Sequence, residues 1–534
     1  MPADPTSLPS TSVPSTSLPS GDTRFDTLII NGRIIDPAND RDEVGAIGIT
    51  DGRISYAGPV GDQAVDRART VIDATGLVVA PGFIDMHSHA QTINGARLQA
   101  LDGVTTALEL EGGALPVSDF YRYSEETGRP INYGYSASWA SARMQVLDDA
   151  TVISPLADSD FRLGLSMFSK YQDGPRWRGP ADAREEAMII DRVRGQVADG
   201  AIGIGVLQGY VPDSEIAEQH HLAELAAEAG QPMFVHSRSM AAVGPGNALD
   251  AVRELIDSSE QSGAPIHQCH MNSTSGHLAD RVAEELTAAQ QRGVRLTTEA
   301  YPYHAGSTVI GAAFIDPDQL ERQRMTPRSV IYLATGERVA DEGRLRELRA
   351  ADPGGLCVLE TFDLEDPKQV SLLMAAVTYP GGAIASDAMP MTYVGPVDGR
   401  ELGIRALTED VWPIPPGMIA HPRSTGCFAQ ALSWVVRDLG AMSLTEMIRR
   451  STVVPATILE QAAPALARKG RLGIGADADV TIFDPATVRP GGDYQHLGPS
   501  VGFRHVIVGG VSVVSDGELV PSAFPGRPIR GSAG

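Results

Sequence analysis

The stretch Pro81-Gly82-Phe83-Ile84-Asp85-Met86-His87-Ser88-His89 is the most informative segment of this chain of 534 residues. It is an apolar run that ends in two histidines, His87 and His89. Side chains two residues apart on a β-strand point the same way, so both imidazoles can face one metal ion. A strand that ends in such a pair is typical of a barrel of parallel strands, where the active site lies at the carboxyl ends of the strands.

Further apolar runs follow along the chain and alternate with helix-like segments. The strand-like runs end near residues 85–89, 107–111, 133–138, 202–207, 233–236, 265–270, 296–300 and 383–387. The segments HHLAELAAEAG (220–230) and DRVAEELTAAQQRG (280–293) have the periodicity of amphipathic helices. No glycine-rich dinucleotide-binding turn follows the first strand. The pattern predicts an α/β protein with a (β/α)8 barrel rather than a doubly wound sheet.

Both ends of the chain have the pattern of a small β domain. Residues 26–36, 45–58 and 70–82 alternate apolar and polar side chains around N-G, D-G and T-G pairs, which predicts hairpins. Residues 475–485 and 503–520 repeat this pattern. We therefore expect one small β domain formed by residues 23–80 and 470–525.

Residues 81–469 are then the metal-dependent barrel domain, with an inserted lid or subdomain at about residues 305–380, a stretch too long for a simple loop. Residues 1–22 are rich in Ser, Thr and Pro and are expected to form a disordered tail.

Composition narrows the classes of function. Lys and Arg number 43 against 67 Asp and Glu, a net charge of −24, which argues against nucleic acid or an anionic membrane as a partner. No apolar run approaches the length of a membrane span. Three widely spaced cysteines exclude a disulfide framework and a zinc ribbon. We expect a cytoplasmic protein with a small-molecule substrate, and the sequence leaves open whether it forms a homo-oligomer.

Polar residues stand at the ends of four predicted strands, where they could share a metal ion. They are His87, His89, His236, His270 and Asp387. Imidazole and carboxylate together suit Zn²⁺, one or two ions, with Mn²⁺, Fe²⁺ or Co²⁺ as alternatives. Taken singly, Asp387 could be a helix N-cap and His270 a core histidine, but five such residues at strand ends favour a metal site.

Two carboxylates follow the second predicted strand. Glu109 and Glu111 point to the same face, and a carboxylate inside a barrel is costly unless it is paired or bound to a cation. Glu111 lies nearer the strand end, so we expect it to bridge two metal ions, with the deeper Glu109 as the second choice.

These motifs together resemble the amidohydrolase superfamily and, within it, the N-acyl-D-amino-acid deacylase (D-aminoacylase) family. The similar stretches cover nearly everything after the tail: PGFIDMHSH (81–89), GVTT (103–106), GAIGIGVLQGYVP (200–212), FVHSR (234–238), QCH (268–270), EAYPYHAGST (299–308), ASDAMP (385–390), HPRSTGCF (421–428) and GRLGIGADADVTIFDP (470–485). The resemblance implies a distorted TIM (β/α)8 barrel, a small β-sandwich domain built from both chain ends, and a zinc site at the mouth of the barrel.

Carried over to this sequence, the resemblance implies roles for individual residues. The metal ligands would be the four histidines named above, with Asp387 as the acid/base that also touches the metal. Arg423 and Ser307 would hold a substrate carboxylate, and Tyr210 and Arg238 would also contact the substrate. The metal-bridging cysteine of the family is absent, since Glu111-Gly112-Gly113 stands there, so the bridging role of Glu111 follows from its position alone.

The implied reaction is hydrolysis of a C–N amide bond, most simply the deacylation of an N-acyl (D-)amino acid. A metal-activated water would attack, and Asp387 would carry the proton to the leaving nitrogen. The alternative is a cyclic amide hydrolase of the hydantoinase, imidase or dihydroorotase type, in which a carboxylated lysine bridges the metals. Lys170 is the candidate for that role. A non-catalytic metal-binding scaffold is the remote third interpretation.

Overall fold

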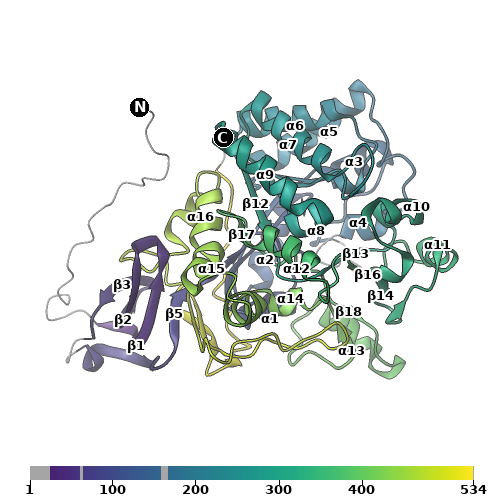
Figure 1. Cartoon of the computed structure of the whole chain (residues 1–534). Helices are drawn as coiled ribbons and strands as arrows, with labels where there is room; N and C mark the ends of the chain where they lie inside the picture. Colours follow the sequence, from purple (N-terminus) through teal and green to yellow (C-terminus); the bar gives the residue numbers. More distant parts are fainter. Residues whose placement is uncertain (1–23, 61–63, 158–165, 533–534) are drawn as a thin grey trace.

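The computed structural model describes residues 24–60, 64–157 and 166–532, and two sheets dominate it (Figure 1). One is a parallel sheet of eight strands that curls into a nearly closed barrel, and the other is a mixed sheet of nine strands built from both ends of the chain. This confirms the predicted fold class. The predicted tail at residues 1–22 lies outside the described residues. No helix within the described ranges is long and apolar enough to cross a bilayer.

The barrel strands follow one another around the sheet in chain order, and each is hydrogen-bonded to the next. They are β6 (Phe83–Asp85), β7 (Val104–Ala114), β8 (Asn132–Ser138), β9 (Ile204–Leu207), β10 (Met233–His236), β11 (Ile266–Gln268), β12 (Leu296–Ala300) and β17 (Ala383–Ile384). All eight overlap the strand-like runs in the sequence.

Helices connect these strands, because consecutive parallel strands need a crossover. In chain order they are α1 (Ile93–Ala100), α2 (Val117–Thr127), α3 (Trp139–Leu147), α4 (Ser166–Tyr171), α5 (Ala183–Ala198), α6 (Ile216–Glu228), α7 (Ala248–Ser262), α8 (Met271–Ser275), α9 (Ala279–Gln291) and α12 (Pro367–Val377). After β17 come α13 (Arg400–Ala406), α14 (Arg423–Gln430), α15 (Leu444–Ser451) and α16 (Val453–Leu459).

Helix α7 illustrates how the sequence sets these elements. The side chain of Asn247 accepts hydrogen bonds from the first-turn amides, and the Asp250 carboxylate accepts one from the amide of Asn247, which forms a capping box. Gly263 ends the helix in a left-handed conformation, with φ at 75°. Between these ends the buried residues Leu249, Val252 and Leu255 form an apolar face toward the barrel.

The barrel closes through residues that follow its first and last strands. Ser88 forms an isolated parallel bridge with Ala388, and the His89 amide donates to the Ala388 carbonyl at 2.8 Å. Asp85, at the end of β6, accepts hydrogen bonds from the amide and the hydroxyl of Ser386. The junction between β6 and β17 therefore lies at the carboxyl ends of the strands.

The interior of the barrel is a packed apolar core. Ile84, Leu108, Ile202 and Phe234 belong to one buried cluster with residues of α16 and with Ile529 near the end of the chain. The polar side chains described below stand at the ends of the same strands. A barrel filled in this way has a functional site at its mouth rather than a channel through it.

The mixed sheet joins the two ends of the chain, as Figure 1 shows for β1, β2, β3 and β5. Its strands are β1 (Phe25–Asp36), β2 (Arg41–Thr50), β3 (Arg53–Gly58), β4 (Ala68–Asp73), β5 (Val78–Pro81), β20 (Val480–Phe483), β21 (Phe503–Val508), β22 (Val511–Ser515) and β23 (Glu518–Leu519). The central contact is β5 against β20, which are antiparallel.

Two of the three predicted N-terminal hairpins are wrong. Only the D-G pair at residues 51–52 turns the chain between paired antiparallel strands. At the N-G pair, β1 continues through a bulge, with Asn31 at a φ of 62°. At the T-G pair, β4 and β5 both lie parallel to β1 and pair with successive parts of it. The long partner strand, rather than the local dipeptide, determines both outcomes.

The stretch after β12 forms a small antiparallel sheet of its own, in the order β13-β16-β14-β15. Its elements are β13 (Ala305–Val309), α10 (Pro317–Leu320), β14 (Val330–Tyr332), β15 (Glu337–Arg338), α11 (Glu342–Ala351) and β16 (Leu356–Glu360). A two-stranded sheet, β18 (Thr392–Tyr393) with β19 (Met418–Ile419), follows β17. The limits of these parts as domains stay a prediction.

Candidate metal and substrate site

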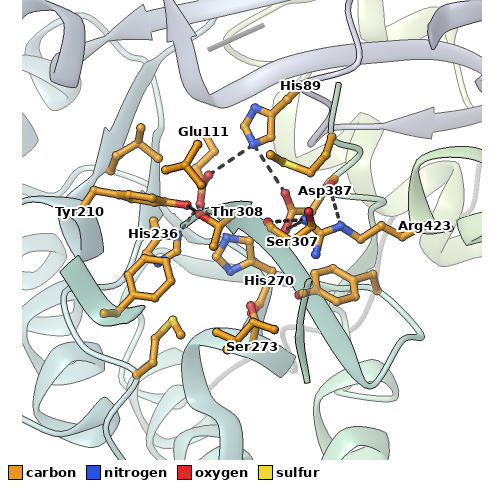
Figure 2. Close-up of a pocket in the computed structure, with 18 of the residues that line it drawn as sticks. His89, Glu111, Tyr210, His236, His270, Ser273, Ser307, Thr308, Asp387 and Arg423 are labelled. Carbon is orange, nitrogen blue, oxygen red and sulfur yellow. Dashed lines mark hydrogen bonds and ion pairs between the residues drawn. The ribbon is translucent and has the colours of Figure 1, made fainter. Parts of the chain in front are cut away.

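Glu111 lies at the centre of a buried cluster at the mouth of the barrel (Figure 2). Its Oε2 is 3.4 Å from His87 Nε2 and 3.6 Å from His89 Nε2. Its Oε1 is 3.2 Å from His236 Nδ1 and 2.7 Å from His270 Nε2. The two oxygens of one carboxylate therefore face two different pairs of histidines.

The donor atoms are close enough to share ions. Glu111 with His87 and His89 forms one group, and Glu111 with His236 and His270 forms another, each with its ligand atoms within 4.8 Å of one another. His87, His270 and Asp387 form a third such group. Imidazole nitrogens and carboxylate oxygens are the donor set that Zn²⁺ and its neighbours prefer. The residues present thus fit one or two divalent transition-metal ions.

Two members of the cluster have unusual backbone conformations. His270 and Asp387 have φ values of 32° and 48°, in the left-handed region that only glycine adopts without strain. Each such residue costs on the order of 1–3 kcal/mol and persists where the surrounding structure enforces it, often at functional sites. Both residues lie within three residues of the end of a barrel strand, at the mouth of the barrel.

The position of His236 depends on a glycine. A Cβ on Gly209 would lie 2.3 Å from the His236 ring, so no larger residue fits there without moving the imidazole. Tyr210, the next residue, packs edge to face against His236 with ring centroids 4.9 Å apart. The Tyr210 hydroxyl forms a hydrogen bond of 2.7 Å with Thr308 Oγ1. Burial raises the pKa of this phenol, so it stays protonated.

Asp387 lies between the histidines and a buried guanidinium. Its Oδ1 is 3.5 Å from the Nε2 atoms of both His87 and His89, and its Oδ2 is 2.7 Å from Arg423 Nη2. Burial raises the pKa of Asp387, but the charges of Arg423 and His87 outweigh it and hold the pKa below its ordinary value. The carboxylate is therefore ionised at neutral pH and able to accept a proton.

The other charges of the cluster depend on one another in the same way. Burial raises the pKa of Glu111, but His270 and His87 outweigh it, so its pKa lies well below the ordinary value. Burial lowers the pKa of His87 and His89, but the neighbouring carboxylates raise both well above the ordinary value. A metal ion would have to displace these protons, since only the neutral imidazole is a ligand.

A cavity opens beside the cluster (Figure 2). Its polar lining includes His89, Glu111, His236, His270, Asp387 and Arg423, and its apolar lining includes Phe168, Leu207, Met240, Val309, Phe314 and Leu359. Tyr210 and Ser307 also line it. The Ser307 hydroxyl and Arg423 Nη1 are buried there without a hydrogen-bond partner among the described residues.

The rest of the Arg423 guanidinium is held by the protein. Nε donates to the Asp387 carbonyl at 2.7 Å, and Nη2 donates to the Ser307 carbonyl at 3.2 Å as well as pairing with the Asp387 carboxylate. The guanidinium also lies over the Tyr301 ring, 4.5 Å from its centroid. This leaves Nη1, rather than the whole planar fork, for a ligand.

Two residues singled out from the sequence lie elsewhere. Arg238 pairs with Glu254 at 2.7 Å and donates to the carbonyls of Pro212 and Ser214. It lines a neighbouring cavity that shares only Met240 and Phe314 with the central one. Lys170 is exposed on α4, with its ammonium 5.4 Å from the Tyr171 ring centroid, and does not line the central cavity.

Sequence analysis missed the carboxylate behind His87. Glu299 is buried, contacts His87 Nδ1, and lies 3.3 Å from His267 Nε2. It is the penultimate residue of β12, a strand that the sequence predicts, but this strand reads LTTEA, so the apolar run that singled out Asp387 is missing here. Glu109, the second choice for a bridge, instead contacts His89 Nδ1 at 2.8 Å.

Comparison with known proteins agrees with this geometry. Residues 70–301 match the model of the amidohydrolase family. The chain is 27% identical to the N-acyl-D-glutamate deacylase of Alcaligenes xylosoxydans xylosoxydans, over 96% of this chain and 97% of that protein. It is 26% identical to the D-aminoacylase of the same organism, over 92% and 94% of the two chains.

A solved structure supports the fold. The N-acyl-D-glutamate deacylase from Bordetella bronchiseptica, complexed with zinc and a phosphonate inhibitor, superposes with a TM-score of 0.71 at 22% identity, covering 95% of this chain and all of that one. Residues 70–301 therefore match the amidohydrolase family, and over nearly its full length the chain is similar to N-acyl-D-amino-acid deacylases.

Proposed function

We propose that this protein is a metal-dependent deacylase that hydrolyses the amide bond of N-acyl amino acids, most simply those of the D series. The observation that carries the proposal is the position of Glu111, whose two oxygens face two histidine pairs beside a cavity that also contains Asp387 and Arg423. The similarity to D-aminoacylase and its relatives supports the choice of bond.

The four histidines, Glu111 and Asp387 would hold the metal, with Zn²⁺ as the ion that best suits their donors. Bound there, the ion would supply Lewis acidity, which acidifies a water molecule and polarises the amide carbonyl. Glu111 would take the place of a bridging cysteine, because each of its oxygens points to a separate set of ligands.

Asp387 is the proposed acid/base. Its carboxylate is ionised and borders the cavity, so it can accept a proton at Oδ1 and deliver it to the leaving nitrogen. An amide nitrogen leaves as the amine only after protonation, so a group that returns the proton is needed on the same side. Arg423 fixes the orientation of this carboxylate through Oδ2.

The substrate carboxylate is proposed to bind at Arg423 Nη1 and the Ser307 hydroxyl. Both groups are buried donors without a protein partner, which is costly unless a ligand satisfies them. A carboxylate there makes a charge-assisted hydrogen bond to Arg423. The apolar side of the cavity, with Leu207, Met240 and Phe314, then faces the remainder of the substrate.

The proposal is tested with Zn²⁺-loaded protein and matched panels of N-acetyl-D- and N-acetyl-L-amino acids, with amine release as the readout. We expect the protein to hydrolyse the N-acetyl amino acids of one enantiomeric series. This activity should be lost after chelation and recovered when Zn²⁺ is added back. Hydantoin and dihydrouracil serve as comparison substrates, because a cyclic amide hydrolase would prefer them. Full activity after exhaustive chelation, or activity on the cyclic amides alone, would contradict the proposal.

A further inference from the structure

We propose that Glu109 and Glu299 are positioning residues that set the tautomer and orientation of the His87/His89 pair and link it to the second pair of histidines. The inference rests on the proposed metal site and deepens it. Neither carboxylate lines the central cavity, and both are buried, at 3% and 2% exposure. Each contacts one imidazole of the first pair through the ring nitrogen that faces away from Glu111.

Glu109 connects His89 to the irregular end of β7 that carries Glu111. Its oxygens lie 2.9 and 2.8 Å from His89 Nδ1, and its Oε1 also accepts from the amides of Gly112 and Gly113 at 3.1 and 3.3 Å. The pairing of β7 with β8 is interrupted between Glu109 and Ala114, so regular hydrogen bonds between the two strands do not fix this end of β7.

Gly113 shows how tightly this end of β7 is packed. Its φ is +68°, and a Cβ there would lie 2.8 Å from both Ser136 Oγ and the Ser138 amide. The Glu109 carboxylate, which accepts from the two glycine amides, therefore holds the backbone that follows Glu111. A substitution at residue 109 should therefore alter the positions of both His89 and the Glu111 carboxylate.

Glu299 has the corresponding position behind His87. Its Oε1 contacts His87 Nδ1 and accepts from the His270 amide at 3.4 Å, so it reaches a ligand of each pair. Its Oε2 is 3.3 Å from His267 Nε2, and His267 Nδ1 is 2.8 Å from Thr297 Oγ1. Glu299 thus lies between His267 on one side and, on the other, His87 and the strained backbone at His270.

The chemical consequence follows from the two nitrogens of imidazole. A neutral histidine carries one N–H, and donation of Nδ1–H to a carboxylate leaves the lone pair on Nε2. In both His87 and His89 the Nε2 atom points to the cluster, and the two Nε2 atoms are 3.2 Å apart. Once both imidazoles are neutral, two lone pairs at this distance favour a cation between them, and the carboxylates behind them make both nitrogens better donors.

The charge balance points the same way. Glu109, Glu111, Glu299 and Asp387 are buried together, and Arg423 is the single guanidinium that pairs with any of them in the described part of the chain. With neutral imidazoles the cluster carries an excess of negative charge that is costly to bury without cations. The two outer glutamates therefore also add attraction for the ions, although they do not touch them.

The test compares Glu109→Gln and Glu299→Gln with Glu218→Gln. Glu218 is an equally buried glutamate whose partners are Arg143 and Trp139, away from the cluster. Glutamine keeps the size and one acceptor oxygen but removes the charge. One readout is the Zn²⁺ dissociation constant of the metal-free protein, measured with a competing chelator. The other is ¹⁵N NMR of labelled histidine, which reports the tautomers.

We expect each of the two variants to weaken Zn²⁺ binding about 10- to 100-fold, with an altered Nδ1 signal, while Glu218→Gln lowers thermal stability and leaves Zn²⁺ affinity unchanged. Zn²⁺ affinity equal to wild type in both variants, or an equal loss in the Glu218 control, overturns the positioning role. A wild-type protein that binds no Zn²⁺ overturns the proposed function instead.

A variant that does not fold has a substitute. His267→Gln removes the outer partner of Glu299 without touching the cluster, and we expect it to weaken Zn²⁺ binding by about threefold to tenfold. Unchanged affinity in a folded His267→Gln protein would count against the role of Glu299.

Discussion

Arg423 and Asp387 form a buried ion pair in which the arginine contacts the aspartate twice, through Nη2 to the carboxylate at 2.7 Å and through Nε to the main-chain carbonyl at 2.7 Å. One side chain therefore fixes both the carboxylate and the strained backbone of the proposed acid/base. Arg423 also lines the cavity, and its Nη1 has no hydrogen-bond partner among the described residues. The proposed proton transfer and substrate recognition would thereby be coupled through a single guanidinium.

Replacement of Asp387 by Asn tests the proton-transfer role. We expect kcat to fall by a factor of about 10²–10⁴, since an amide cannot accept and return the proton. Zn²⁺ content should stay near the wild-type value, because Glu111 and the histidines remain. The control is Glu228→Gln, which changes an exposed glutamate on α6. A fully active Asp387→Asn protein would remove Asp387 from the mechanism.

Replacement of Ser307 by Ala tests the carboxylate subsite. The Ser307 hydroxyl has no protein partner, so its loss should leave the fold intact. We expect KM to rise about tenfold for N-acetyl amino acids, the size of one hydrogen bond to a charged group. For the corresponding N-acetyl amino amides, which lack the carboxylate, KM should not change. An equal rise for both substrate series would place the carboxylate elsewhere.

The charge of the cavity predicts selectivity. Arg423 is the only lysine or arginine among the residues that line it, and it is already paired with Asp387. A second substrate carboxylate would be buried without a partner, at a cost of a few kcal/mol. We expect kcat/KM for N-acetyl-methionine to exceed that for N-acetyl-glutamate of the same hand by about 100-fold. A preference for the acidic substrate would show that a further cation reaches the cavity.

Replacement of Glu111 by Gln tests the two-sided ligand. Since each carboxylate oxygen faces a different histidine pair, we expect the variant to hold less Zn²⁺ per chain and kcat/KM to fall at least about 100-fold. The measurement is metal content after dialysis, together with activity at added Zn²⁺. Full metal content and full activity would be incompatible with a bridging role.

Asp102 predicts how stability depends on pH. It accepts hydrogen bonds from the amides of Phe428 and Ala429 and from the Ser500 hydroxyl, and burial raises its pKa from 3.8 to about 8. Because the folded protein holds this proton more tightly than the unfolded chain, its contribution to stability is complete below pH 4. That contribution is lost as the pH rises to about 8, at up to about 1.4 kcal/mol per pH unit.

Asp102→Asn removes this dependence while keeping an acceptor oxygen for one of the two amides. The free energy of unfolding of the metal-free wild type and variant is measured in urea between pH 5 and pH 8. We expect the variant to gain stability relative to wild type as the pH rises. A difference between the two that does not change with pH would mean that Asp102 is ionised throughout.

The barrel and most of the site follow from one local regularity, the apolar run that ends in a polar residue. It located β6 with His87 and β17 with Asp387, because a buried strand needs apolar side chains and its end does not. Glu299 also lies near the end of a predicted strand, but β12 contains two threonines instead of an apolar run, and a single carboxylate is compatible with a surface position, so the sequence alone did not distinguish it.

Other features depend on contacts that the local sequence does not contain. Arg238 lies two residues beyond β10, where the period-two rule no longer applies, and its side chain turns to Glu254. The N-G pair at residues 31–32 has the dipeptide of a hairpin but lies in the middle of the long strand β1, which pairs with β2, β4 and β5 on both sides of it. Pairing partners distant in sequence decided both cases.

The junction between the first and last barrel strands has a consequence for synthesis and breakdown of the protein. It is formed by Asp85 with Ser386, separated by 301 residues, and by Ser88 with Ala388. A nascent chain cannot complete the mouth until its eighth strand has emerged. An ion gathered by His87 and Asp387 would cross-link that junction, and demetallated protein should exchange its amide hydrogens there first and become open to proteases at the same place.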